Sequence, residues 1–229
     1  MPAQPFHIVF PLFPGVTQLD FTGPYQVFMR LPGAVVTVAS TAGGTLDADG
    51  LTFAGLRKLT EVDRCDLICV PGGVPVTDVF ADDSFLRELK RLAGGARYVT
   101  SVCTGSLLLA AAGLLKGRRA ACHWAWRDLL AKFSGVTVDT GRVVRDGNVI
   151  TGGGVTAGID LALTVAAEVA GPEVAQAIQL NLEYAPEPPF NSGRPENAPP
   201  GVRAIVDARI ASYMPARRAA VEAAVLKLG

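Results

Sequence analysis

A strand, turn and helix centred on Cys103 constrain the fold of this chain more than any other stretch. Residues 97 to 103 are β-branched and apolar enough for a buried strand, and residues 106 to 115 carry apolar side chains at helical spacing. Cys103 and Thr104 therefore form the turn between them. Such a turn places the sulfur beside unpaired helix N–H groups, which lower a thiol pKa from its free value of about 8.5. With Gly105 relieving crowding, the segment predicts a nucleophile elbow built with sulfur.

The remaining cysteines do not have the spacing of a disulfide or a metal site. Cys65 and Cys69 fall in one predicted strand, about 13 Å apart, too far for one disulfide or one metal ion to bridge. Cys122 stands beside His123, but two adjacent ligands without a second pair do not make a zinc site. We expect no metal. For Cys103 the alternative is a small inert core side chain, the usual fate of a free cysteine.

Strands alternate with helices along most of the chain. This pattern predicts a mainly parallel sheet in a three-layer α/β/α sandwich. Pro11 suggests that the first strand ends at a sheet edge or exits early, and Asp49-Gly50 and Asp146-Gly147 are hairpin turns. We expect the Asp49-Gly50 hairpin to be an addition to the core and not a part of it. Strands are predicted at 7–13, 34–40 and 65–73, and helices at 83–92, 105–115, 155–170 and 172–184.

Two further stretches are candidates for the site around Cys103. Gly72 and Gly73 end a buried strand and offer backbone N–H groups at the carboxyl edge of the sheet, where ligands bind in open α/β folds. Asp20 lies among apolar residues before a helix expected near Pro24, and apolar surroundings raise the pKa of a carboxyl group. The alternative for Asp20 is a helix cap, which capping statistics make about as probable.

Residues 152–157, GGGVTA, match a dinucleotide-binding fingerprint but lie late in the chain. The acidic residue expected about 20 positions later is absent, because Gly171-Pro172-Glu173 stands there between two helices. The glycines therefore predict a tight turn that lets the following helix pack closely on the sheet. We expect no nicotinamide or other cofactor.

Composition excludes several classes of partner. The 229 residues are 49% hydrophobic and carry 21 basic and 21 acidic side chains, without a basic cluster for nucleic acid or an anionic membrane. No apolar run reaches the roughly 18 residues of a membrane span, and the N-terminus lacks a signal-peptide pattern. We expect a cytoplasmic protein with one domain over 1–229. Residues 185–201 should be irregular, followed by a helical tail broken at Pro215.

Seven motifs extend over nearly the whole length of the chain: QLDFTGP, CVPGG, RYVTSVCTGSLLLAAAGLL, GRRAACHW, RVVRDGN, TGGGVTAGID and LEYAPEPPF. Through these motifs the chain resembles the isocyanide hydratases of the ThiJ/PfpI superfamily. This resemblance implies a flavodoxin-like sandwich, a homodimer and no metal. It also implies that Cys103 is the nucleophile, Asp20 the general acid/base and Thr104 its polar neighbour.

The implied reaction adds water to an isocyanide and gives an N-substituted formamide through a cysteine thioimidate. Thr104 and the amides of Gly72 and Gly73 would orient the acid or stabilise developing charge. The competing interpretation is a ligand sensor related to AraC-type transcriptional regulators, which share the cysteine segment. The tail is too short for their DNA-binding domain, and a sensor has no evident need for Asp20. These two features favour the hydratase.

Overall fold

An eight-stranded sheet with helices on both faces forms the body of the molecule. A computed structural model describes residues 5–228. The strand order is β3-β4-β2-β1-β5-β6-β10-β9, and only the β3–β4 and β9–β10 pairings are antiparallel. The strands are β1 Phe6–Pro11, β2 Ala34–Ser40, β3 Gly44–Ala48, β4 Leu51–Lys58, β5 Leu67–Val70, β6 Tyr98–Val102, β9 Val143–Asp146 and β10 Val149–Gly152. A separate parallel pair contains β7 Arg118–Ala120 and β8 Val136–Val138.

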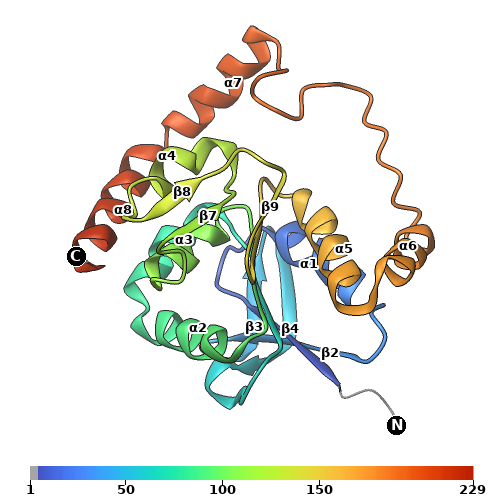
Figure 1. The fold of residues 1–229 in the computed structure, drawn as a ribbon. Helices are drawn as coiled ribbons and strands as arrows, with labels where there is room; N and C mark the ends of the chain where they lie inside the picture. The colour runs from blue at the N-terminus through green and yellow to red at the C-terminus, as the bar shows by residue number, and fades with distance from the viewer. Residues whose placement is uncertain (1–4, 229) are drawn as a thin grey trace.

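Helices cover the sheet in two layers, which confirms the predicted three-layer sandwich. Figure 1 shows α1, α5 and α6 on one side of the sheet and α2, α3, α4 and α8 on the other. The helices are α1 Gln18–Phe28, α2 Asp83–Gly95, α3 Gly105–Ala111, α4 Arg127–Leu130, α5 Ala157–Ala170, α6 Pro172–Asn181, α7 Pro200–Ala211 and α8 Met214–Leu228. Short 3₁₀ helices are η1 Leu59–Glu61, η2 Val74–Ala81 and η3 Trp124–Trp126. Within residues 5–228, no helix is long and apolar enough to cross a bilayer.

Three details differ from the sequence predictions. β1 lies at the centre of the sheet, so Pro11 marks an early strand end and not an edge. The hairpin of β3 and β4 is part of the main sheet, because β4 pairs with β2. The C-terminal helices separate at residues 212–213, and Pro215 belongs to the first turn of α8, where a missing N–H costs little.

Helix α1 begins earlier than predicted, at Gln18, and continues through Gly23 and Pro24. Close packing against α5 accounts for these residues. A Cβ atom at Gly23 would lie 3.2 Å from the Ile159 side chain, and one at Gly158 would lie 3.0 Å from Pro24. The small residues therefore let the two helices approach, at the cost of the N–H that proline lacks.

The sheet topology brings three loops to one edge. β1, β5 and β6 are adjacent and parallel, so the segments that follow their carboxyl ends lie side by side. These segments are residues 12–17, 71–73 and 103–104. The edge therefore carries every residue that the sequence placed in the candidate site, with Asp20 on the first turn of α1 just beyond the first loop.

Candidate active site

Cys103 occupies a strained turn between β6 and α3, as the sequence predicts. Its φ is 59°, a left-handed conformation that is uncommon for a residue with a side chain. Its backbone N–H donates to the carbonyl oxygens of Gly152, at 3.1 Å, and Gly153, at 2.7 Å. A Cβ atom on Gly105 would lie 2.2 Å from the Val70 carbonyl oxygen, so only glycine fits after the turn.

Asp20 is completely buried beside this turn. Its Oδ2 accepts a hydrogen bond of 2.9 Å from the Gly72 N–H. Its Oδ1 is buried and has no well-aligned hydrogen-bond partner among the described residues. The N-cap of α1 is Thr17, and Asp20 is the third helical residue. The capping alternative for Asp20 is therefore wrong, and the complete burial of this carboxyl group points to a chemical role.

Burial raises the pKa of Asp20 to about 7, which is the direction predicted from its apolar neighbours. The Gly72 N–H and the Cys103 side chain act in the opposite direction, because they stabilise the carboxylate by hydrogen bonding. The charge of Asp49 raises the pKa slightly more. At neutral pH this carboxyl group can therefore both accept and donate a proton.

The pKa of Cys103 differs from the expectation. The sequence suggested that the helix N-terminus lowers it, whereas burial raises it well above its ordinary value and ionised Asp20 raises it further. Backbone N–H groups of Val155 and Thr104 hydrogen-bond to the sulfur and lower the pKa, but burial outweighs them. Helix α3 has only seven residues, and desolvation of a fully enclosed sulfur exceeds the effect of its N-terminus. The ionisation of Cys103 therefore depends on whether Asp20 carries a charge.

Gly72, Gly73 and Thr104 lie together, but their hydrogen bonds are directed within the protein. The Gly72 N–H is used by Asp20, and the Gly73 N–H donates to Thr104 Oγ1 at 2.8 Å. The Thr104 hydroxyl in turn donates to the Gly73 carbonyl oxygen at 3.0 Å. The Gly72 N–H therefore orients the acid, which is one of the two roles expected of these amides, while the Gly73 N–H is used by Thr104. They fix the carboxyl group and the cysteine turn in place.

The loop after β10 is the part of the site that the sequence reasoning missed. Its glycines were interpreted only as a tight turn, yet they accept both hydrogen bonds from the Cys103 N–H. The backbone N–H of Val155, in the same loop, lowers the pKa of the Cys103 thiol. The available signal was the position of a glycine run at the end of a strand. This signal can be interpreted only when the strand order is known, because β10 pairs with β6 and this pairing places Gly152 opposite Val102.

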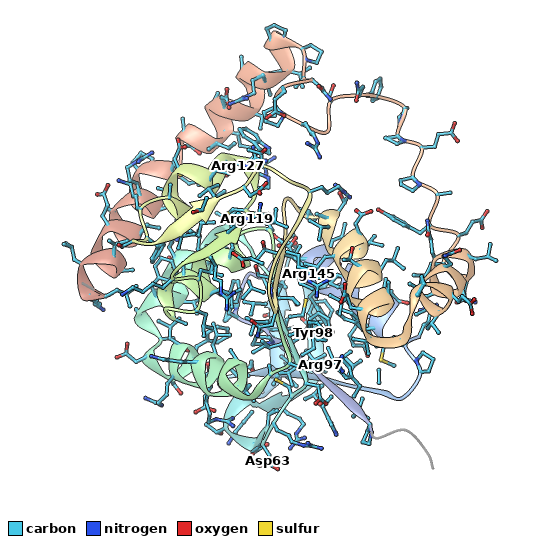
Figure 2. The ribbon with its side chains drawn as sticks, viewed as in Figure 1. Asp63, Arg97, Tyr98, Arg119, Arg127 and Arg145 are labelled. Carbon is cyan, nitrogen blue, oxygen red and sulfur yellow. The ribbon has the colours of Figure 1, made fainter. Side chains whose placement is uncertain are left out.

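The other candidate residues do not form a second reactive centre. Cys65, Cys69 and Cys122 are buried free thiols whose pKa values burial raises to about 12. Burial lowers the pKa of His123 to about 4, with Arg127 as a second cause. Within residues 5–228, no three His, Cys, Asp or Glu side chains are grouped to hold a metal ion. Figure 2 shows Arg127 at the opposite end of the molecule from Tyr98, the first residue of β6. Arg127 therefore lies toward the carboxyl edge of the sheet.

Comparison with known proteins identifies the family. The model of the DJ-1/PfpI family matches residues 7–168, which include the Cys103 turn and Asp20. The chain belongs to the DJ-1/PfpI family. It is 48% identical to the isonitrile hydratase of Pseudomonas putida over 96% of this chain and 97% of that protein. The similarity thus extends through the C-terminal tail.

Two further proteins are similar to this chain, one of them by its crystal structure. The crystal structure of a ThiJ/PfpI family protein from Pseudomonas syringae matches with a TM-score of 0.90 and 37% identity, over 95% of this chain and 90% of that one. The HTH-type transcriptional regulator CdhR of Pseudomonas aeruginosa is 30% identical over 76% of this chain. That match covers 53% of the regulator, so it concerns only part of the regulator.

Replacing Gly72 by alanine tests whether the close packing of the site is essential. The new Cβ would lie 2.5 Å from both the backbone nitrogen and the hydroxyl of Thr104, and 2.9 Å from Asp20 Oδ2. We expect Gly72→Ala to lower the free energy of unfolding by more than about 2 kcal/mol, because the buried backbone of Thr104 cannot move away from the new Cβ without disturbing its own packing. Urea unfolding measures this change.

Gly94→Ala is the matched control, since Gly94 is exposed in α2 with no atom within 4 Å of the added Cβ. This variant should be neutral or more stable by about 0.5 kcal/mol. Equal stabilities of the two variants would contradict the packing described at Gly72.

Proposed function

We propose that this protein is an isocyanide hydratase, which converts an isocyanide and water into an N-substituted formamide. The observation that carries the proposal is the buried pair of a cysteine in a strained turn and a carboxyl group whose pKa lies at about 7. The 48% identity to the P. putida isonitrile hydratase over almost the full chain supports the choice of substrate class. A pair of this kind supplies one nucleophile and one proton, which are the two groups that an isocyanide carbon requires.

In the first step the sulfur of Cys103 bonds to the terminal carbon of the isocyanide. The thiol proton passes through Asp20 to the same carbon, which is nucleophilic until it is protonated. One S–C bond and one C–H bond form, and the product is a thioimidate on Cys103. Asp20 accepts the proton and then delivers it, so it ends this step ionised.

In the second step water adds to the thioimidate carbon. Ionised Asp20 accepts a proton from the water and transfers it to the nitrogen, which gives a tetrahedral intermediate. The C–S bond then breaks as the new hydroxyl group loses its proton to the pair. This collapse releases the N-substituted formamide and returns one proton to Asp20 and Cys103.

The backbone around the pair positions the reacting groups. The Gly72 N–H holds Oδ2 of Asp20, which leaves Oδ1 available for proton transfer. The N–H groups of Val155 and Thr104 stabilise negative charge on the sulfur as it forms and as it leaves. Thr104 contributes through its backbone, since its hydroxyl group is held by Gly73.

The sensor interpretation rests on the similarity to CdhR. Ligand binding alone does not need a completely buried carboxyl group beside the thiol, because burying such a group destabilises its charged form. Proton transfer does need it. The pair therefore favours the enzyme.

An assay with a simple alkyl or aryl isocyanide tests the function directly. We expect formamide to form, and Cys103→Ser to reduce turnover by more than about 10²-fold, because a serine hydroxyl is a far weaker nucleophile. Cys69→Ser is the matched control, since Cys69 is a buried cysteine outside the proposed mechanism. Absence of formamide with the wild-type protein, or full activity in Cys103→Ser, would overturn the proposal.

The pH dependence of kcat/KM tests the role of Asp20. Below pH 7 the pair carries two protons, so Asp20 cannot accept the thiol proton, and kcat/KM should fall as the pH drops. Because the pKa of Cys103 is well above its ordinary value, activity should stay constant beyond pH 9. In Asp20→Asn the rate should fall by roughly 10² to 10⁴ and the inflection near pH 7 should disappear. A variant that keeps both rate and inflection would exclude Asp20 as the acid/base.

We further propose that the protein is a homodimer. The segment 185–199 runs across open space from α6 to α7 in Figure 1, and residues 185–194 are all exposed. Helix α7 has no buried residue, and it exposes Ile205 at 73%. Phe190 is exposed at 77%. An extended arm with these apolar side chains gains stability by packing on a second copy.

Light scattering at micromolar concentration should therefore give the mass of two chains. Ile205→Glu combined with Phe190→Glu should shift the population toward one chain, because a dimer contact would then bury two carboxylates. Leu226→Glu is the control, on the exposed face of α8. A single-chain mass for the wild-type protein would contradict the dimer.

A further inference from the structure

A cavity at the carboxyl edge of the sheet, on the side of the β3–β4 hairpin, has no part in the proposed reaction. Its volume is about 750 Å³, which lies within the range of pockets that bind small organic molecules. It lies where β1 and β2 end, between residues 12–14 and 40–42, and it is bounded by β3 and η2. Asp20, Cys103 and Thr104 are not among the described residues that line it. The cavity is therefore a separate candidate site.

The most buried residues of the lining form an apolar floor. Leu12 and Phe13 follow β1, Leu46 belongs to β3 and Phe85 to α2. Each of these four side chains is at most 6% exposed. The rings of Phe13 and Phe85 pack edge to face, with centroids 6.1 Å apart. Such a floor favours the apolar part of a ligand, because contact with it removes apolar surface from water.

Three carboxylates, of Asp47, Asp78 and Asp82, form a more exposed rim above this floor. Asp78 pairs with Arg217 of α8, so its charge is balanced within the protein. Oδ1 of Asp47 accepts a hydrogen bond of 2.6 Å from the uncharged hydroxyl group of Thr52. Among the residues that the structure describes, no lysine, arginine or histidine lines the cavity. The rim therefore carries an excess of negative charge, which attracts a cation.

Hydrogen bonds between neighbouring elements hold the walls of the cavity. The Thr41 hydroxyl group, after β2, donates to Oδ2 of Asp82 at 3.0 Å. Oδ1 of the same carboxylate accepts a hydrogen bond of 2.9 Å from the Phe85 N–H at the start of α2. The Gly15 N–H, after β1, donates to the backbone carbonyl oxygen of Asp47 in β3 at 3.0 Å. The cavity therefore needs little rearrangement to take a ligand, which lowers the entropic cost of binding.

We propose that this cavity is a second ligand site, which binds a small organic amine. The apolar body of the amine lies on the floor, and its ammonium group lies at the rim beside Asp47 and Asp82. An organic acid is repelled by the rim, and a neutral molecule of the same shape lacks the ionic contacts. An inorganic cation leaves the apolar floor unused. The site does not depend on the hydratase function, since it shares no side chain with the pair of Asp20 and Cys103.

Calorimetric titration of the full chain with naphthylethylamine tests the ligand class. We expect a Kd of about 1 mM or tighter, which is ordinary for a ligand of this size. Naphthylethanol and naphthylacetate keep the apolar body without the cation, and ethylamine keeps the cation without the body. Each of these three should bind at least about tenfold more weakly. Equal affinities for the amine and the alcohol, or no binding of the amine, would overturn the proposal.

Variants of the rim test where the amine binds. Asp47→Asn combined with Asp82→Asn keeps a hydrogen-bond acceptor at both positions, and it should weaken amine binding about tenfold without changing the affinity for the alcohol. Asp63→Asn is the matched control and should bind the amine as the wild-type protein does. Asp63 is an exposed aspartate ahead of β5, at the amino edge of the sheet (Figure 2).

A further measurement separates this site from the catalytic pair. Alkylation of Cys103 with iodoacetamide should leave amine binding unchanged, whether or not any isocyanide is hydrated, because Cys103 does not line the cavity. Amine binding that is lost on alkylation would place the amine in the catalytic site and contradict a second site. Amine binding that is unchanged in the double variant would contradict the role of the rim.

Discussion

The burial of the Asp20 carboxyl group beside Cys103 is the constraint on which the rest of the site depends. A carboxyl group without solvent needs a hydrogen-bond donor, and the Gly72 N–H supplies one at 2.9 Å. This contact leaves no room for a side chain at position 72. The same burial raises the pKa of Asp20 to about 7 and that of the Cys103 thiol well above its ordinary value, so at neutral pH a carboxyl group that can accept a proton lies beside a protonated thiol.

Much of the fold follows from local patterns in the sequence. The alternation of strands and helices predicts the sandwich, and paired turn residues such as Asp49 and Gly50 locate the hairpins. The strand, turn and glycine around Cys103 predict the turn, because a side chain at position 105 would collide with the Val70 carbonyl oxygen. Helix α1 was misplaced because Pro24 normally marks a helix start, and here the contact with Ile159 and its neighbours overrides that preference.

The pKa values and hydrogen-bond partners of the site could not be predicted from local sequence patterns. Whether the helix N-terminus or burial controls the Cys103 thiol depends on how completely the fold encloses the sulfur, and composition gives no measure of that. The partners of Gly73 and the contact from Val155 depend on strand order, since β10 must lie beside β6 to bring its loop to the sulfur.

The shared proton is the central claim, and the titration of Cys103 tests it most directly. The rate of alkylation by iodoacetamide is measured against pH in the wild-type protein and in Asp20→Asn. Because ionised Asp20 raises the pKa of Cys103, removing its charge should move the rise in reactivity to lower pH. A profile that stays in place, or moves to higher pH, would contradict the coupling between the two groups.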